Sequence, residues 1–143
     1  MKVALLDVNV LLALMWPNHQ HHGIAADWFL KNHSKGWATC AFTEAGFIRL
    51  SCNPAYTPQP SIPLEAAEVL DELRALKGHH FLAEAPSLTT AAGLKVLEQA
   101  RSHQQVTDAY LVNTARHHRA VLVTFDGGVL ELKPAVGTVL VLR

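Results

Sequence analysis

Two short apolar runs in this chain each lead directly toward an aspartate. Residues 3–6 are Val-Ala-Leu-Leu and end at Asp7, while residues 120–124 are Ala-Val-Leu-Val-Thr and run on to Asp126. Continuous apolar runs of this length are typical of strands buried on both faces, as in a parallel sheet covered by helices. The two runs therefore predict interior strands whose carboxyl ends carry acidic side chains.

Segments with helical spacing separate these runs from further short strands. Four prolines between residues 53 and 63 exclude a continuous element there and predict a surface loop. Strands that alternate with helices predict an α/β fold with a central, mainly parallel sheet flanked by helices. Ligands of such sheets bind beyond the carboxyl ends of the strands. The predicted helices include 43–52, 63–77, 88–100 and 106–118, and the further strands are 37–39, 80–82 and 138–142.

The composition fits one compact domain spanning residues 1–143, because half of the residues are hydrophobic and only 17% are charged. Twelve basic and twelve acidic residues balance, so any nucleic-acid partner must be held by local groups rather than by a global basic excess. Cys40 and Cys52 are too few for a secreted disulfide framework, and no apolar stretch is long enough to span a bilayer. These features predict a cytoplasmic protein without a membrane partner.

Four of the twelve acidic residues stand beside apolar sequence at the edge of a predicted element. Taken singly, each has an ordinary structural explanation. Asp7 suits a helix cap, Asp126 suits a turn before Gly127, and Glu44 and Asp108 suit the amino-terminal turns of helices. The other eight have surface explanations, such as the spacing of Asp27 and Lys31 for an ion pair along a helix.

The joint placement of these four acids predicts more than their separate positions do. Two end parallel strands and two begin helices that would pack at the same edge of the sheet. Like charges 4 Å apart repel by about 4 kcal/mol at an effective dielectric constant of about 20, so protons or a divalent cation must compensate. Mg²⁺ and Mn²⁺ prefer oxygen ligands. The sequence therefore predicts a magnesium-type site.

Four motifs together resemble the PIN-domain ribonucleases, and in particular the VapC toxins of bacterial toxin-antitoxin pairs. The motifs are Leu-Asp-Val-Asn-Val-Leu at 6–11, Thr-Glu-Ala at 43–45, Thr-Asp-Ala-Tyr-Leu at 107–111 and Val-Thr-Phe-Asp at 123–126. The resemblance covers nearly the whole length. Trp-Ala-Thr-Cys at 37–40 is similar to the subgroup common in mycobacteria.

The resemblance implies a PIN-like fold and a Mg²⁺- or Mn²⁺-dependent endoribonuclease. A bound cation would activate water for hydrolysis of the RNA backbone, leaving a 3′-hydroxyl and a 5′-phosphate. Glu44 would bind the metal through water or orient the attacking water, with Asn9 and Thr124 as supporting polar residues. The implied catalytic quartet is Asp7, Glu44, Asp108 and Asp126, of which Asp7, Asp108 and Asp126 would bind metal directly.

The resemblance also implies partners. These are an RNA substrate, a VapB-like antitoxin that covers the acidic groove, and a second copy of the nuclease in a homodimer. Gly127 and Gly128 stand where an arginine and a second acid often follow the last aspartate in the family. The alternative is a catalytically silent PIN-like module that binds RNA or protein. The intact acidic positions argue against it, because their mutual repulsion has no structural use.

Other chemistries match the sequence less well. His19 and His22 are spaced to meet on one helical face as metal ligands, but a polar helix start explains them more simply. Asn9 stands where haloacid-dehalogenase-like phosphatases carry their second acid. No Gly-x-Ser-x-Gly motif supports acyl transfer.

Overall fold

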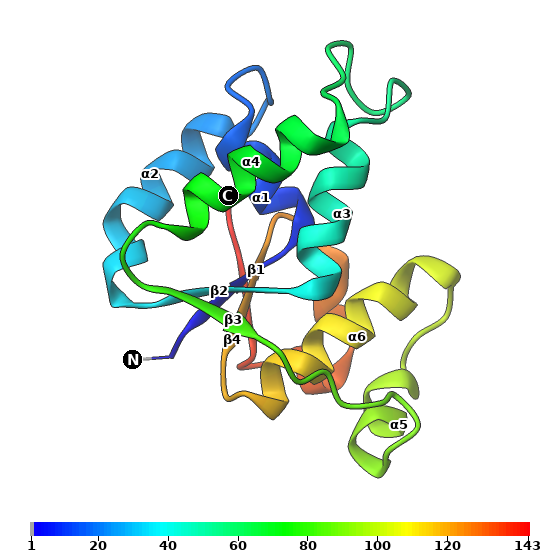
Figure 1. The fold of residues 1–143 in the computed structure, drawn as a ribbon. Helices are drawn as coiled ribbons and strands as arrows, with labels where there is room; N and C mark the ends of the chain where they lie inside the picture. The colour runs from blue at the N-terminus through cyan, green and yellow to red at the C-terminus, as the bar shows by residue number, and fades with distance from the viewer. Residues whose placement is uncertain (1) are drawn as a thin grey trace.

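The computed structural model describes residues 2–143, which form a sheet covered by helices on both faces (Figure 1). The strands are β1 (Ala4–Leu6), β2 (Trp37–Cys40), β3 (His79–Leu82), β4 (Val121–Thr124) and β5 (Val139–Val141). The helices are α1 (Val8–Met15), α2 (His22–Asn32), α3 (Ala41–Ser51), α4 (Pro63–Arg74), α5 (Ala91–Leu97) and α6 (His103–His117), with short 3-10 turns at His33–Lys35, Gly127–Glu131 and Lys133–Ala135.

The five strands are all parallel and lie in the order β3-β2-β1-β4-β5, which confirms the predicted parallel α/β sheet. The chain starts at the central strand β1, builds outward through β2 and β3, and then crosses to β4 and β5 on the other side. The strand order therefore reverses between β1 and β4. In open parallel sheets this switch point opens a crevice at the carboxyl ends of the strands, where ligands bind.

Two hydrophobic cores lie on opposite faces of the sheet. Helices α1 to α4 pack on one face through buried residues such as Leu11, Phe29 and Phe47, around the strand residues Leu6 and Trp37. Helices α5 and α6 cover the other face, where their core side chains meet those of the strands. Figure 1 shows the two groups of helices on either side of the sheet. Both faces are buried, which explains why the inner strands are continuously apolar.

The predicted start of helix α6 was wrong. This helix begins at His103 rather than near residue 106, so Asp108 lies in its second turn and not in its first. Its first turn is polar and exposed, and gives no apolar periodicity that sequence reasoning can detect. The role of Asp108 as a helix-terminus residue is thereby excluded, because the helix dipole acts within the first turn. No helix within residues 2–143 combines the length and apolarity that crossing a membrane requires.

Candidate active site

A hydrogen-bond network joins β1 to β4 at the switch point of the sheet. The Thr124 hydroxyl donates to Oδ2 of Asp7 at 2.7 Å, and the side-chain amide of Asn9 donates to that hydroxyl oxygen at 3.1 Å. Asn9 Oδ1 also accepts the backbone N–H of Phe125 at 3.2 Å. Residues more than a hundred positions apart are thus locked together, because β1 and β4 are adjacent and in register.

Asp7 has a second, structural contact. Its Oδ1 accepts the backbone N–H of Val8 at 2.7 Å, at the start of α1. The contact that caps α1 and the contact with Thr124 use different oxygens of the Asp7 carboxylate. This geometry fixes the carboxylate at the end of β1.

Asp126 and Asp108 line one polar depression of about 370 Å³ between the start of α6 and the turn after β4. Asp126 follows β4, and its Oδ1 accepts the backbone N–H of Gly128 at 2.9 Å. The same depression contains Arg101, Gln105 and Glu131. Glu131 is held there by the amide of Gln105, which donates to it at 2.6 Å.

The three aspartates interact electrostatically. Burial raises the pKa of Asp7, and the charge of Asp126 raises it further, against the lowering effect of the hydrogen bonds from Thr124 and Val8. Burial also raises the pKa of Asp108 to about 6, with added contributions from the charges of Asp126 and Asp7. The charge of Asp126 thus makes the ionisation of Asp7 and Asp108 less favourable, and the charge of Asp7 does the same for Asp108. A bound cation would reverse this effect.

We expect Asp108→Asn to increase the stability of the metal-free protein at pH 7. The pKa of Asp108 is about 6 in the folded chain against 3.8 as the ordinary value, so the folded state binds more protons between these pH values. The contribution of Asp108 to stability therefore falls as pH rises from about 4 to 6. Asparagine carries no charge, so the variant does not lose stability in this way. The gain in the free energy of unfolding at pH 7 is about 1 kcal/mol after allowance for solvent screening.

Denaturant unfolding in the presence of a chelator, at pH 4 and at pH 7, measures this effect. The stability difference between Asp108→Asn and wild type should grow from the lower to the higher pH. Glu68→Gln, on an exposed position of α4, is the matched control and should give a small difference at both values. A difference for Asp108→Asn that is the same at both pH values would contradict the electrostatic assignment.

Glu44 belongs to a cluster beside the strands β2 and β3. Its Oε2 accepts the hydroxyl of Thr39 at 2.6 Å, and its Oε1 accepts Nη1 of Arg74 at 3.3 Å. Glu44 is not among the groups that raise the pKa of Asp7 or Asp108. The hydrogen bonds of Glu44 thus run to β2 and α4, whereas the charge contributions to the pKa values of Asp7 and Asp108 come from the other aspartates.

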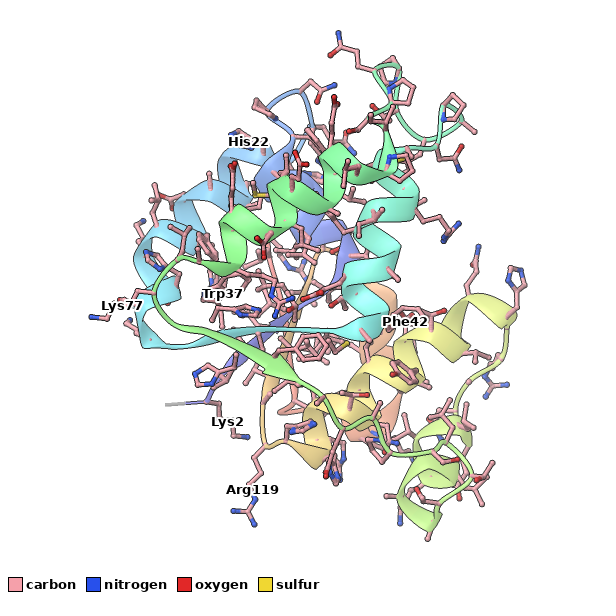
Figure 2. All side chains as sticks on the ribbon, viewed as in Figure 1. Lys2, His22, Trp37, Phe42, Lys77 and Arg119 are labelled. Atoms are coloured by element: carbon pink, nitrogen blue, oxygen red, sulfur yellow. The ribbon has the colours of Figure 1, made fainter. Side chains whose placement is uncertain are left out.

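Two aromatic side chains connect the helices that carry Glu44 and Asp108. Phe42, in the first turn of α3, lies beside α6 (Figure 2), and its ring centroid is 5.1 Å from that of Tyr110. Each ring is two residues from the acidic residue on its own helix. This contact joins the first turn of α3 to α6 close to both acidic residues.

The side chains fit a hard divalent cation by their chemistry, although they do not enclose one as they are placed. Within residues 2–143 no group of three or more His, Cys, Asp or Glu side chains is close enough to hold a metal ion. The reason is local: Asp7 turns to Thr124 and Val8, and Asp126 turns to Gly128. The donors are all oxygens, and burial together with neighbouring negative charge raises the pKa of Asp7 and Asp108. The histidines suggested as an alternative site form no such group either, and His22 instead contacts the carbonyl of Ala13.

Three residues at the site escape reasoning from sequence. Arg74 and His79 contact the cluster around Glu44 from α4 and β3, and Glu131 shares the depression of Asp108. Arg74 is 30 positions from Glu44 in the sequence, and His79 is 40 positions from Thr39. Glu131 lies in a 3-10 turn, which has no periodic sequence pattern. Of the three, only Glu131 is an acidic residue, and the sequence predicted that it lies in a loop.

Comparison with known proteins identifies the family. The family model described as PIN domain matches residues 4–133, which is most of the chain. The chain belongs to the PIN-domain family. The match contains all four acidic positions and the whole β1–β4 junction, and it confirms the resemblance inferred from the motifs.

The relatives of this PIN chain include several mycobacterial proteins. It is 46% identical over 130 residues to ribonuclease VapC38 of Mycobacterium tuberculosis, covering 91% of this chain and 89% of that protein. It is 41% identical over 129 residues to ribonuclease VapC39 of the same species, covering 90% and 91%. Ribonuclease VapC44 is 40% identical over 125 residues, covering 86% and 85%. The predicted likeness to mycobacterial VapC proteins is confirmed.

Proposed function

We propose that this PIN chain is a Mg²⁺- or Mn²⁺-dependent endoribonuclease, and the toxin of a toxin-antitoxin pair. The observation that carries the proposal is the placement of Asp7 and Asp126 after the adjacent strands β1 and β4, with Asp108 lining the same polar depression as Asp126, where the three carboxylates repel one another. Repulsion among these carboxylates lowers the stability of the metal-free fold. A bound cation would neutralise their charge and remove this penalty. The relatives named ribonuclease VapC38 and VapC39 support the choice of RNA as substrate.

Each residue has a distinct part in the proposed reaction. Asp7, Asp108 and Asp126 would hold the cation, which when bound supplies charge neutralisation at the scissile phosphate and lowers the pKa of water. Thr124 and Asn9 orient Asp7 through the hydrogen bonds described above. Glu44 orients the attacking water. The chain needs no nucleophilic side chain, and the products are a 3′-hydroxyl and a 5′-phosphate.

The proposal extends to partners and compartment. A toxic nuclease must be inhibited in its host. We therefore propose a VapB-like antitoxin that binds over the acidic depression. We also propose a single PIN domain over residues 1–143 that acts as a homodimer in the cytoplasm. Balanced charge, with 12 basic and 12 acidic residues, means that RNA must be held by local groups.

The test is incubation of the purified protein with a pool of transfer, ribosomal and messenger RNA. Cleavage is expected with Mg²⁺ or Mn²⁺ and should stop when a chelator is added. End-group analysis should find 5′-phosphates on the products. Cleavage that persists in excess chelator would overturn the metal-dependent mechanism, and RNA binding without any cleavage would favour a silent binding module.

A further inference from the structure

Glu44 is held from both sides by side chains of other elements. Arg74 donates from the last residue of α4 to Oε1, and Thr39 donates from β2 to Oε2. Each carboxylate oxygen thus accepts a separate donor, which leaves little freedom for rotation of the group. A carboxylate that only balanced the amino terminus of α3 would need neither contact.

The Thr39 hydroxyl has one proton, and the Glu44 carboxylate only accepts. His79 Nε2 lies 2.8 Å from the same hydroxyl oxygen. Since the hydroxyl proton points to Glu44, the second contact requires His79 to donate through Nε2–H. Burial and the charges of Arg74 and His80 lower the pKa of His79 to about 4, so its ring is neutral at pH 7. A directed chain therefore runs from His79 through Thr39 to Glu44.

Arg74 is itself held in place. Its Cζ atom lies 5.2 Å from the centre of the Phe81 ring on β3, within the range of a cation–π contact. The side chain of Glu44 is only 16% exposed and that of Arg74 36%, so water screens this pair less than the exposed pair of Lys31 and Asp27, at 71% and 67%. Arg74 is a fixed partner of Glu44 rather than a mobile surface charge.

From this geometry we infer that Arg74 is a positioning residue, which together with Thr39 clamps the carboxylate of Glu44 in the orientation needed to direct the attacking water. The inference rests on the proposed function for its kinetic meaning. The residues that hold Glu44 come from α4, β2 and β3. The position of α4 therefore affects the orientation of the Glu44 carboxylate. Residues that orient a metal-site group typically change activity by about 10–100-fold when removed.

A double-mutant cycle tests this inference in the full-length protein. Arg74→Ala should lower kcat/KM for RNA cleavage about 10–100-fold, acting on kcat more than on KM. In a Glu44→Ala background the same change should cost less than about twofold, because Arg74 then has nothing to position. Lys31→Ala is the matched control: it removes the same charge and an ion pair on α2, and should leave cleavage unchanged.

A direct contact of Arg74 with RNA gives a different pattern. Arg74→Ala would then weaken RNA binding equally in both backgrounds and reduce the slope of log affinity against log salt by about 1. That result would overturn the positioning role.

Nitrogen-15 NMR of His79 provides a second measurement that needs no cleavage. At pH 7 the wild-type ring should carry its proton on Nε2. Glu44→Ala frees the Thr39 hydroxyl to donate to the ring and should shift the population toward the Nδ1–H form, and Arg74→Ala should shift it part of the way. An unchanged tautomer in both variants would overturn the clamp even if wild-type protein cleaves RNA. A changed tautomer with no cleavage by wild type would overturn the proposed function and leave the clamp standing.

Discussion

Asp7→Asn should abolish RNA cleavage, with a loss of roughly a thousandfold or more in kcat/KM. Asparagine has the same shape and still offers an oxygen to the backbone N–H of Val8, where it caps α1 as well as aspartate does. It lacks the negative charge that a divalent cation requires. The variant therefore keeps the cap of α1 while it removes the charge and the oxygen that accepts the Thr124 hydroxyl.

The stability of Asp7→Asn is the control for this prediction. Because burial raises the pKa of Asp7, removal of the charge relieves a penalty at pH 7 that offsets the lost acceptor of the Thr124 hydroxyl, so the metal-free variant should stay folded with a stability close to that of the wild type. Thermal or denaturant unfolding in chelator measures this directly. A variant that is inactive because it is unfolded would be uninformative on charge, whereas a folded variant that retains cleavage near the wild-type rate would contradict the assignment of Asp7.

Thr124→Val should have the next largest effect, about 10–100-fold in kcat/KM. The hydroxyl donates to Asp7 and accepts the Asn9 amide and the backbone N–H of Asp126, both at 3.1 Å. Valine keeps the shape of the buried side chain but leaves these groups without their shared partner. The unsatisfied groups should also lower stability by about 1–3 kcal/mol. Steady-state cleavage and denaturant unfolding on the same preparations measure the two effects.

Two further variants show whether the hydroxyl itself is responsible. Thr124→Ser retains it and should restore most of the activity. Thr114→Val removes another fully buried threonine hydroxyl, whose bond is to the carbonyl of Tyr110 within α6, and should leave cleavage close to wild type. Equal losses for Thr124→Val and Thr114→Val would indicate general damage to the fold rather than misplacement of Asp7.

The sequence predicted the parts of the site that depend on local pattern. The apolar runs before Asp7 and Asp126 identify buried parallel strands, and parallel strands in one sheet bring their carboxyl ends to a shared edge. Adjacency of β1 and β4, on which the bond between Thr124 and Asp7 depends, came from the family resemblance. Periodicity alone does not give the order of strands in a sheet.

The sequence did not predict features that depend on long-range contact or on irregular segments. Arg74 follows the ordinary pattern of a charged residue at the end of a helix, and only the packing of α4 on α3 brings it to Glu44. The first turn of α6 is polar, so its true start at His103 had no apolar marker. The orientation of the acidic side chains could not be predicted either. Carboxylates at one sheet edge need not point toward a common centre, because nearby hydroxyl and N–H groups also bind their oxygens.

The central claim is that Asp7, Asp108 and Asp126 together bind a divalent cation, and a Mn²⁺ titration of the RNA-free protein tests it most directly. Isothermal calorimetry or electron paramagnetic resonance should show saturable Mn²⁺ binding to wild type, with affinity at least about tenfold weaker in each of Asp7→Asn, Asp108→Asn and Asp126→Asn. Glu68→Gln should bind as wild type does. Mn²⁺ binding of the same affinity in all three aspartate variants, or no saturable binding to wild type, would contradict the account.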